Sequence, residues 1–274
     1  MKRDGRFRRS SDSRVIQRFH CLGCSKHFSL ATTHPCFRQK KRQFNFRIDK
    51  LYCSGVSQRR MAKILNLSRT TIVRKLRFRE PYAELELSEF NQARPLAEVI
   101  EFDDMETFEH TKCKPLSITL AVESKTRRIL GFEVSRMPAR GKLARIAYKK
   151  YGPRKDERER ARSRLFEKIK PFLKEGAVIK SDQNPHYPAS VKRHFPLSPH
   201  EAFKGQRGSI VGQGELKKIR FDPLFSLNHT CAMFRANVNR LFRKTWCTTK
   251  VPERLHGHLA MYAIYHNLQL MLGP

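Results

Sequence analysis

The sequence predicts an α/β fold in which a mixed sheet is flanked by helices. Four short apolar runs, each bounded by turn residues or charge, have the character of β-strands; they span residues 99–102, 116–122, 128–134 and 177–180. The first three follow one another so closely that we expect an antiparallel meander. Three longer stretches carry apolar residues at helical spacing, at residues 154–170, 227–243 and 251–270. We therefore expect an α/β domain over residues 99–250, followed by a C-terminal helix over residues 251–274.

Residues 45–80 predict two helices joined by a short turn. Ser57 and Ser68 are in position to cap them, since a serine side chain can accept a hydrogen bond from a free backbone N–H of the first turn. An arrangement of this kind is typical of a helix-turn-helix, whose second helix enters the major groove of DNA, although an ordinary helical hairpin would give the same pattern. Residues 81–98, punctuated by Pro81 and Pro95, are expected to form a linker. The outward face of the second helix would carry the candidate DNA contacts Arg69, Thr70, Thr71, Arg74 and Lys75.

The basic segment 1–44 contains the pair Cys21-x-x-Cys24 around Gly23. Two thiolates at this spacing in a tight turn can hold one tetrahedral zinc ion, but a closed site needs four ligands. A second Cys-x-x-Cys is absent, and the remaining ligands would have to come from His20, His27, His34 or Cys36. The segment is therefore interpreted as a partial zinc knuckle, which either binds Zn²⁺ or is a remnant that does not.

The charge balance indicates a polyanionic partner. The chain of 274 residues has 57 Lys and Arg against 25 Asp and Glu, a formal net charge of +32. Such a charge causes self-repulsion, and nucleic acid is the usual partner that neutralises it by releasing condensed counterions. No apolar run has the length of a membrane span, and no apolar segment follows the Arg-rich N-terminus. We therefore expect no membrane partner and reduced cysteines in a cytoplasmic protein.

Acidic residues stand at the ends of two predicted strands. Asp103 and Asp104 follow the first strand, and Asp182 follows the fourth. Strand ends can hold carboxylates on rigid backbone beside a cleft, and a pair of carboxylates on adjacent strands can bind two Mg²⁺ ions about 3.5–4 Å apart. Such oxygen ligands favour Mg²⁺ or Mn²⁺ over zinc. Because neighbouring side chains alternate between the faces of a strand, we expect Asp104 to point away from Asp103 and to pair with a basic residue.

Three segments of the chain resemble bacterial insertion-sequence transposases of the acidic-triad (DDE) type, which belong to the ribonuclease-H-like or retroviral-integrase superfamily. The sequence FDDM at residues 102–105 resembles the segment of the first catalytic Asp, and IKSDQNPHY at residues 179–187 resembles that of the second. The basic run FRANVNRLFRKT at residues 234–245 resembles the helix that follows the third acid. The zinc knuckle and the helix-turn-helix also occupy their expected places before the catalytic domain.

The resemblance implies a ribonuclease-H-like catalytic domain and a function in DNA transposition. Asp103 and Asp182 would hold the catalytic Mg²⁺ ions, and the enzyme would cleave DNA at the ends of the element and join them to target DNA. A homo-oligomer on DNA, associated with the bacterial nucleoid, would be the working form. A catalytically inactive or non-enzymatic DNA-binding protein that uses only the helix-turn-helix is the alternative.

The third acid of the family pattern is missing from its expected place. The family places a Glu some seven residues before the Arg that matches Arg235, and this position is occupied by Asn228. An Asn can ligate a metal through its amide oxygen, but without charge. The third ligand is therefore Asn228, or Asp222 or Glu215 in a shifted register, or the chain is an inactive copy.

Basic residues on and after the same helix are the candidates for holding the transferred DNA end. Arg side chains can grip phosphates through two parallel hydrogen bonds. The alternative is a solvated basic helix face. The candidates are Arg235, Arg240, Arg243 and Lys244.

Overall fold

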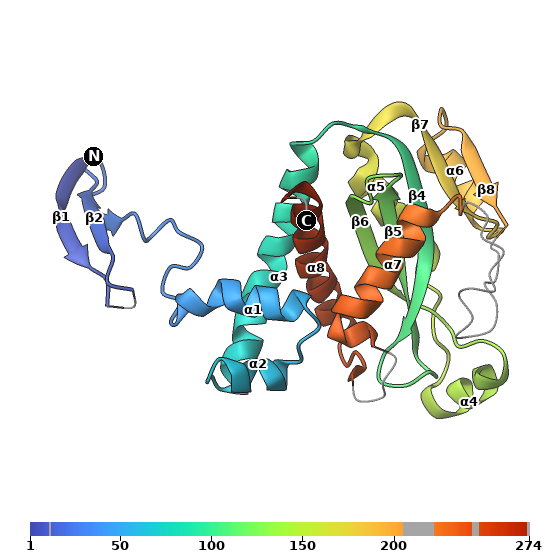
Figure 1. The fold of residues 1–274 in the computed structure, drawn as a ribbon, viewed down its shortest axis with the longest axis horizontal. Coiled ribbons are helices and arrows are strands. Elements are labelled where there is room, and N and C mark those ends of the chain that lie inside the picture. The colour runs from blue at the N-terminus through green and yellow to red at the C-terminus, as the bar shows by residue number, and fades with distance from the viewer. Residues whose placement is uncertain (11, 205–221, 243–246, 273–274) are drawn as a thin grey trace.

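A computed structural model describes residues 1–10, 12–204, 222–242 and 247–272 of the chain. Figure 1 shows a small N-terminal sheet, a group of helices, and a larger sheet with helices on both faces. Residues 99–102, 116–122, 129–134 and 177–180 lie in strands of the larger sheet, as the sequence predicts, and Arg128 directly precedes its strand. None of the helices in the described part of the chain combines the length and apolar character needed to cross a membrane.

The larger sheet is mixed and has five strands in the order β6-β5-β4-β7-β8. The first three strands along the chain form the expected antiparallel meander, whereas β7 is parallel to β4 and β8 is parallel to β7. The α/β class and the mixed sheet flanked by helices are thereby confirmed. The strands are β4 (Ala97–Phe108), β5 (Pro115–Glu123), β6 (Ile129–Arg136), β7 (Leu173–Asp182) and β8 (His200–Phe203).

Two hydrophobic cores lie on opposite faces of this sheet. Alternate residues of β5, such as Leu116, Ile118 and Leu120, face the larger core together with residues of the helices α1, α2, α3, α7 and α8. On the other face, Ile100 and Phe102 of β4 pack against the helices α5 and α6. These helices are α1 (Asn45–Cys53), α2 (Gln58–Ile64), α3 (Arg69–Gln92), α5 (Arg158–Ile169), α6 (Tyr187–His194), α7 (Phe225–Asn237) and α8 (Pro252–Leu272). Because successive side chains of a strand point to opposite faces of the sheet, one strand contributes residues to both cores.

Helix α3 extends well beyond the region where the sequence predicts a second helix. Ser57 caps α2 by accepting a hydrogen bond from the backbone N–H of Arg60, and Ser68 caps α3 in the same way with Thr71. Both caps are as predicted. The structure continues α3 to Gln92, with Pro81 inside it, so most of the expected linker 81–98 is helical and its last two residues belong to β4. The physical reason is that α3 packs along α8, which lies far away in the sequence.

The N-terminal segment forms a separate three-stranded antiparallel sheet. Its strands are β1 (Lys2–Arg8), β2 (Val15–His20) and β3 (His27–Ser29). The Cys21-x-x-Cys24 pair occupies the turn between β2 and β3, where the N–H of Cys21 donates to the carbonyl of Lys26. A short 3-10 helix, Arg42–Phe44, leads from this region into α1.

The remaining elements depart only modestly from the sequence prediction. Helix α5 begins at Arg158 rather than at residue 154, and α7 ends at Asn237, followed by the 3-10 helix Asn239–Leu241. An additional helix, α4 (Lys142–Tyr151), lies between β6 and α5. Figure 1 shows α4 standing beyond the end of the sheet at which β4 finishes.

Candidate functional site

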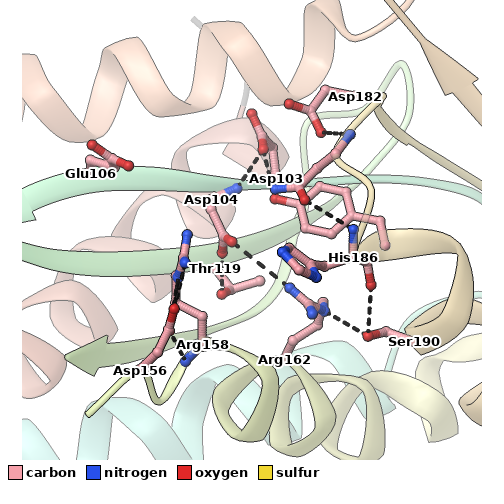
Figure 2. A network of polar contacts seen from close by, with 12 residues as sticks. Asp103, Asp104, Glu106, Thr119, Asp156, Arg158, Arg162, Asp182, His186 and Ser190 are labelled. Carbon is pink, nitrogen blue, oxygen red and sulfur yellow. Dashed lines mark hydrogen bonds and ion pairs between the residues drawn. The ribbon is translucent and has the colours of Figure 1, made fainter. Parts of the chain in front are cut away.

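Asp103 and Asp182 lie on neighbouring parallel strands at the same level of the sheet. Strand β4 pairs with β7 through Ile100 opposite Ile179 and Glu101 opposite Lys180. Two residues further along each strand come Asp103 and Asp182, so the same register sets them beside each other. Neither aspartate is fully buried, and Figure 2 shows the two side chains near each other. The juxtaposition expected from the sequence is therefore present. Asp182 is the last residue of β7, as predicted. The prediction that Asp103 and Asp104 follow the first strand is wrong, because pairing with β5 continues β4 as far as Phe108.

The ionisation of both aspartates is perturbed. Burial, together with the negative charge of Asp182, raises the pKa of Asp103 from 3.8 to about 6. The pKa of Asp182 is also raised, mainly by burial and in addition by the charge of Asp104. A carboxylate whose charge is disfavoured by burial and by a neighbouring carboxylate is an arrangement that a cation would relieve.

Each aspartate has one oxygen held by the protein. Oδ1 of Asp103 accepts hydrogen bonds from the backbone N–H of Asp104 (2.7 Å) and from the hydroxyl of Tyr187 (2.9 Å). Oδ1 of Asp182 accepts from the backbone N–H of Asn184 at 3.0 Å. Within the described part of the chain, the Oδ2 atoms of both residues are left free of hydrogen bonds. The site is thus oriented by the chain and still open to a ligand.

Tyr187 and Arg162 support this site from the other face of β4. The buried ring of Tyr187 packs against Phe102 with 4.7 Å between ring centroids, and the guanidinium of Arg162 lies 5.0 Å from its centre. Arg162 is itself buried and donates from Nε to the hydroxyl of Ser190 at 2.9 Å. Sequence reasoning missed both roles. Tyr187 stands in the motif around Asp182 without any further signal of its own, and Arg162 belongs to a charge run that gives no sign of burial.

Asp104 faces away from the side of β4 that carries the Asp103 side chain, as alternation predicts. Its side chain accepts a hydrogen bond from Thr119 and lies 3.9 Å from the guanidinium of Arg162. Figure 2 shows Asp104 directed toward Arg162 while Asp103 approaches Asp182. Its expected pairing with a basic neighbour is therefore confirmed.

Helix α7 is fastened to β4 two residues before Asp103. The buried carboxylate of Glu101 accepts hydrogen bonds from the backbone N–H of Leu227 (2.8 Å) and from the hydroxyl of Ser124 (2.7 Å). A carboxylate in the first turn of a helix satisfies a free N–H and matches the helix dipole. Glu101 is thus an anchor that sequence reasoning did not single out, because the motif begins only at Phe102.

A stripe on α7 combines Asn228 with Cys231 and Arg235, at spacings of three and four residues. Burial raises the pKa of Cys231 to about 12, with Arg235 opposing and Asp103 adding to the shift. Cys231 therefore lies within electrostatic reach of both Asp103 and Arg235. Residues three and four apart share a helix face, so Asn228 lies on the same side of α7 as this pair.

Two of the alternatives for the third ligand bind each other. The side-chain amide of Asn228 donates to Oδ2 of Asp222 at 2.8 Å, and Oδ1 of Asp222 accepts from the backbone N–H of Leu224 at 2.9 Å. Asp222 therefore stabilises the entry into α7, and no polar contact among the described residues joins it or Asn228 to Asp103. The third alternative, Glu215, lies outside the described residues.

The basic candidates after Asn228 gather at one hollow. Arg235 and Arg240 line a depression of about 530 Å³ together with residues 105–108 at the far end of β4. Arg240 also donates to the carbonyl of Thr248 at 3.1 Å, which fixes its direction. Arg243 and Lys244 lie outside the described residues.

The candidate DNA contacts on α3 are not all on the surface. Arg69, Thr70 and Arg74 are exposed, and Thr71 is half-buried beside the cap Ser68. Lys75 is buried: its ammonium donates to the carbonyl of Lys40 at 2.6 Å, and burial lowers its pKa. The expected outward position of Lys75 is therefore wrong, because the segment leading into α1 covers this side of the helix.

The thiols of Cys21 and Cys24 lie next to each other in the β2–β3 turn. Hydrogen bonds from the backbone and the thiol of Cys24 lower the pKa of Cys21, which favours the thiolate that a metal would need. His20 and His27 stack on each other with 4.5 Å between ring centroids. Across the described residues, no group of three or more His, Cys, Asp or Glu side chains is arranged to hold a metal ion.

The donor set at Asp103 and Asp182 fits Mg²⁺ or Mn²⁺. In phosphoryl-transfer sites Mg²⁺ is commonly bound by one or two carboxylates, with waters and substrate phosphates filling the other positions. Two ionised carboxylates with open oxygens meet that requirement without a third acidic side chain. A soft or borderline metal such as zinc would favour nitrogen or sulfur ligands.

Comparison of the chain with protein-family models and with curated proteins finds no match. The functional argument therefore rests on the residues and geometry described above.

Proposed function

We propose that this protein is a transposase that binds the ends of an insertion sequence and performs Mg²⁺-dependent DNA strand cleavage and strand transfer. In this proposal the five-stranded sheet with its flanking helices is a ribonuclease-H-like catalytic domain. The observation that carries the proposal is the side-by-side position of Asp103 and Asp182 on parallel strands, with the pKa of Asp103 raised to about 6.

The chain's own residues would orient the reacting groups. Divalent ions bound by Asp103 and Asp182 would activate a water or a 3′-hydroxyl and stabilise the leaving oxygen. Tyr187 holds Oδ1 of Asp103, so that Oδ2 faces the open side of the site. Arg235 and Arg240, which line the hollow beyond the site, would contact DNA phosphates. Asn228 would supply a neutral oxygen from α7 once DNA is bound.

The N-terminal elements would recognise DNA. Helices α2 and α3 with their serine caps are interpreted as a helix-turn-helix that presents Arg69, Thr70, Thr71 and Arg74 to the major groove. The three-stranded N-terminal sheet with Cys21 and Cys24 would be a partial zinc ribbon. The net charge of +32 supports a polyanionic partner.

A strand-transfer assay tests the catalytic assignment. Linear duplexes that contain the genomic DNA on either side of the gene are incubated with the full chain and Mg²⁺ or Mn²⁺. We expect cleavage and joining by the wild type, and a loss of about a hundredfold or more for Asp103→Ala and for Asp182→Ala, since each removes a charged metal ligand. Asn228→Ala should retain more activity than either, because it removes only a neutral ligand.

Glu175→Gln is the matched control. Glu175 is an exposed acid on β7, seven residues before Asp182 and at the other end of that strand, so its neutralisation should leave activity near the wild-type level. Equal activity of Asp103→Ala and wild type would contradict the metal-site assignment. A wild type that binds these DNA ends but never cleaves them would favour the non-enzymatic DNA-binding protein.

A further inference from the structure

Helix α4 is an exposed segment that neither core explains. None of its residues belongs to either hydrophobic core, and Ala147 is its only buried residue. Gly141 and Gly152, both with positive φ, bracket the helix and set it off from the chain before and after it. An isolated helix of this length is only marginally stable in water. Packing in the hydrophobic cores therefore does not account for α4, whereas a binding role of its exposed surface would.

The outer face of α4 is basic. Lys142, Arg145 and Lys149 follow at spacings of three and four residues, which places them on one side of the helix. Within the described part of the chain, none of the three forms an ion pair. Residues 136–155 hold eight Lys and Arg and no Asp or Glu. Three of the eight, Arg136, Arg140 and Arg154, pair with acids elsewhere in the chain. The basic residues on α4 itself are left uncompensated among the described residues, which is the electrostatic signature of a phosphate-binding surface.

Large side chains are interleaved with these charges. Ile146 is 54% exposed and Tyr148 is 67% exposed, each beside the basic residues. Tyr148 also lines a hollow of about 610 Å³ under the helix, together with Pro138 and Ala139. An exposed aromatic ring beside lysines is the combination with which proteins stack on unpaired bases while holding the backbone. A helix face that only contacts solvent does not require an exposed aromatic ring beside its lysines.

The inner side of α4 is turned toward the protein. Ala147 is buried, and the ring of Tyr151 lies 4.7 Å from the ammonium of Lys114. Helices that lie in a membrane surface need a continuous free apolar face opposite their basic face. In α4 the free apolar side chain Ile146 lies among the basic residues instead, so the pattern favours nucleic acid over a lipid surface.

The segment that carries α4 is anchored to the strand that carries Asp103. Arg140 pairs with Glu106 at 3.6 Å, and Arg154 pairs with Glu109 at 3.0 Å. Glu106 is three residues beyond Asp103, or about 10 Å along the strand at the usual rise. The start of the segment that carries α4 is thereby held within the length of one helical turn of DNA, about 34 Å, from Asp103.

We propose that α4 is a second nucleic-acid-binding surface, separate from helix α3. Lys142, Arg145 and Lys149 contact phosphates, and Tyr148 stacks on an unpaired base of the DNA that leaves the site. The inference deepens the proposed function, since it takes DNA as the ligand, but it requires no catalysis.

Binding of a forked DNA to the full chain without divalent metal tests this surface. The probe is a labelled duplex with a single-stranded tail, titrated at a series of salt concentrations. We expect Lys142→Gln/Lys149→Gln to reduce the slope of log K against log salt by about 2, and the affinity at about 0.1 M salt by about tenfold or more. Tyr148→Leu should weaken binding of the forked DNA by about tenfold and leave binding of a blunt duplex unchanged.

The matched control is Lys125→Gln/Lys170→Gln, which removes two exposed lysines at the opposite end of the sheet. Equal slopes for the two double variants would overturn the proposal for α4. A Tyr148→Leu variant that binds forked DNA like the wild type would overturn the stacking contact. If the α4 variant loses only its binding to phosphatidylserine vesicles, the surface is a lipid site and the proposal is wrong.

The comparison of salt slopes separates this proposal from the proposed function, because it is made without divalent metal and requires no strand cleavage. If the strand-transfer assay fails, the comparison of salt slopes still tests DNA binding by α4. Equal slopes would overturn the proposal for α4 even if the protein is an active transposase.

Discussion

Asp103 stands where burial and a neighbouring carboxylate both oppose its charge. Its pKa in the folded protein, about 6, exceeds the ordinary value of 3.8. Between these pH values the folded protein binds a proton that the unfolded chain has released. Stability therefore falls as the pH rises through this window, and the loss is complete above about pH 6. At neutral pH the ionised side chain of Asp103 therefore lowers the free energy of unfolding.

Asp103→Asn should therefore stabilise the metal-free protein at neutral pH. A shift of about two pKa units corresponds to a gain on the order of 1–3 kcal/mol in the free energy of unfolding. The gain should shrink as the pH is lowered toward 4, where the wild-type residue is protonated. Urea unfolding in EDTA at several pH values measures it, with Glu175→Gln as an exposed control. A stability loss at neutral pH would contradict the assigned electrostatics.

Tyr187→Phe should change the ionisation of Asp103 more than the stability of the fold. The hydroxyl of Tyr187 donates to Oδ1 of Asp103 and so favours the carboxylate. Without it, the pKa of Asp103 rises further, and the acid limb of the pH–activity profile should move to higher pH. Tyr82→Phe on α3 is the control. An unchanged profile with unchanged activity would show that Tyr187 has no positioning role.

The sequence allowed some residues to be placed but not others. Asp103 and Asp182 could be found because each directly follows an apolar run. The continuation of β4 beyond Asp103 to Phe108 could not, because it depends on pairing with β5. The burial of Lys75 could not be foreseen, since it depends on the carbonyl of Lys40, which lies 35 residues earlier. Arg162 is similar: its burial follows from the packing of α5 on α6, and its sequence neighbourhood shows only charge.

At the scale of elements, α3 and α8 form the interface that joins the N-terminal helices to the sheet. Glu80 of α3 is buried at this interface, where it pairs with Arg254 and lies 3.6 Å from His258. A Cβ atom at Gly257 of α8 would overlap the side chain of Glu80. Gly257 therefore permits the close approach of the two helices around this buried charge.

Gly257→Ala should destabilise the protein by about 1–3 kcal/mol through overpacking, although Ala is the better helix former by about 1 kcal/mol. The double variant Glu80→Ala/Gly257→Ala should be more stable than the sum of the two single effects predicts, because removal of Glu80 makes room. Thermal or urea unfolding of the four proteins measures this coupling. A stabilising Gly257→Ala would show that the helices do not approach as closely as described.

Helix α3 continues through Pro81. A proline inside a helix removes one hydrogen bond and typically costs about 3 kcal/mol, which is why residues 81–98 are expected to be a linker from sequence alone. Ala83 and Leu87 beyond the proline are buried in the larger core. Their packing partners on α8 lie more than 150 residues later in the chain, so no local pattern could reveal what offsets the proline.

At the scale of the whole molecule, one sheet organises two cores and positions the site between them. The larger core fixes α7 and α8 on one face, and the smaller core fixes α5 and α6 on the other. Asp103 lies at the point where residues from both sides meet, with Tyr187 coming from α6 and Cys231 from α7. The α/β class and the meander follow from local sequence patterns. The meeting of these helices does not, because it depends on long-range packing.

Cation binding measures the central claim most directly. Mn²⁺ binding to the full chain, followed by electron paramagnetic resonance, should weaken by about tenfold or more in Asp103→Asn and in Asp182→Asn, and remain unchanged in Glu175→Gln. Because Asp103 must be ionised to ligate, the wild-type affinity should fall as the pH decreases through about 6. Binding that is equal in all four proteins and insensitive to pH in this range would contradict a shared site at the two aspartates.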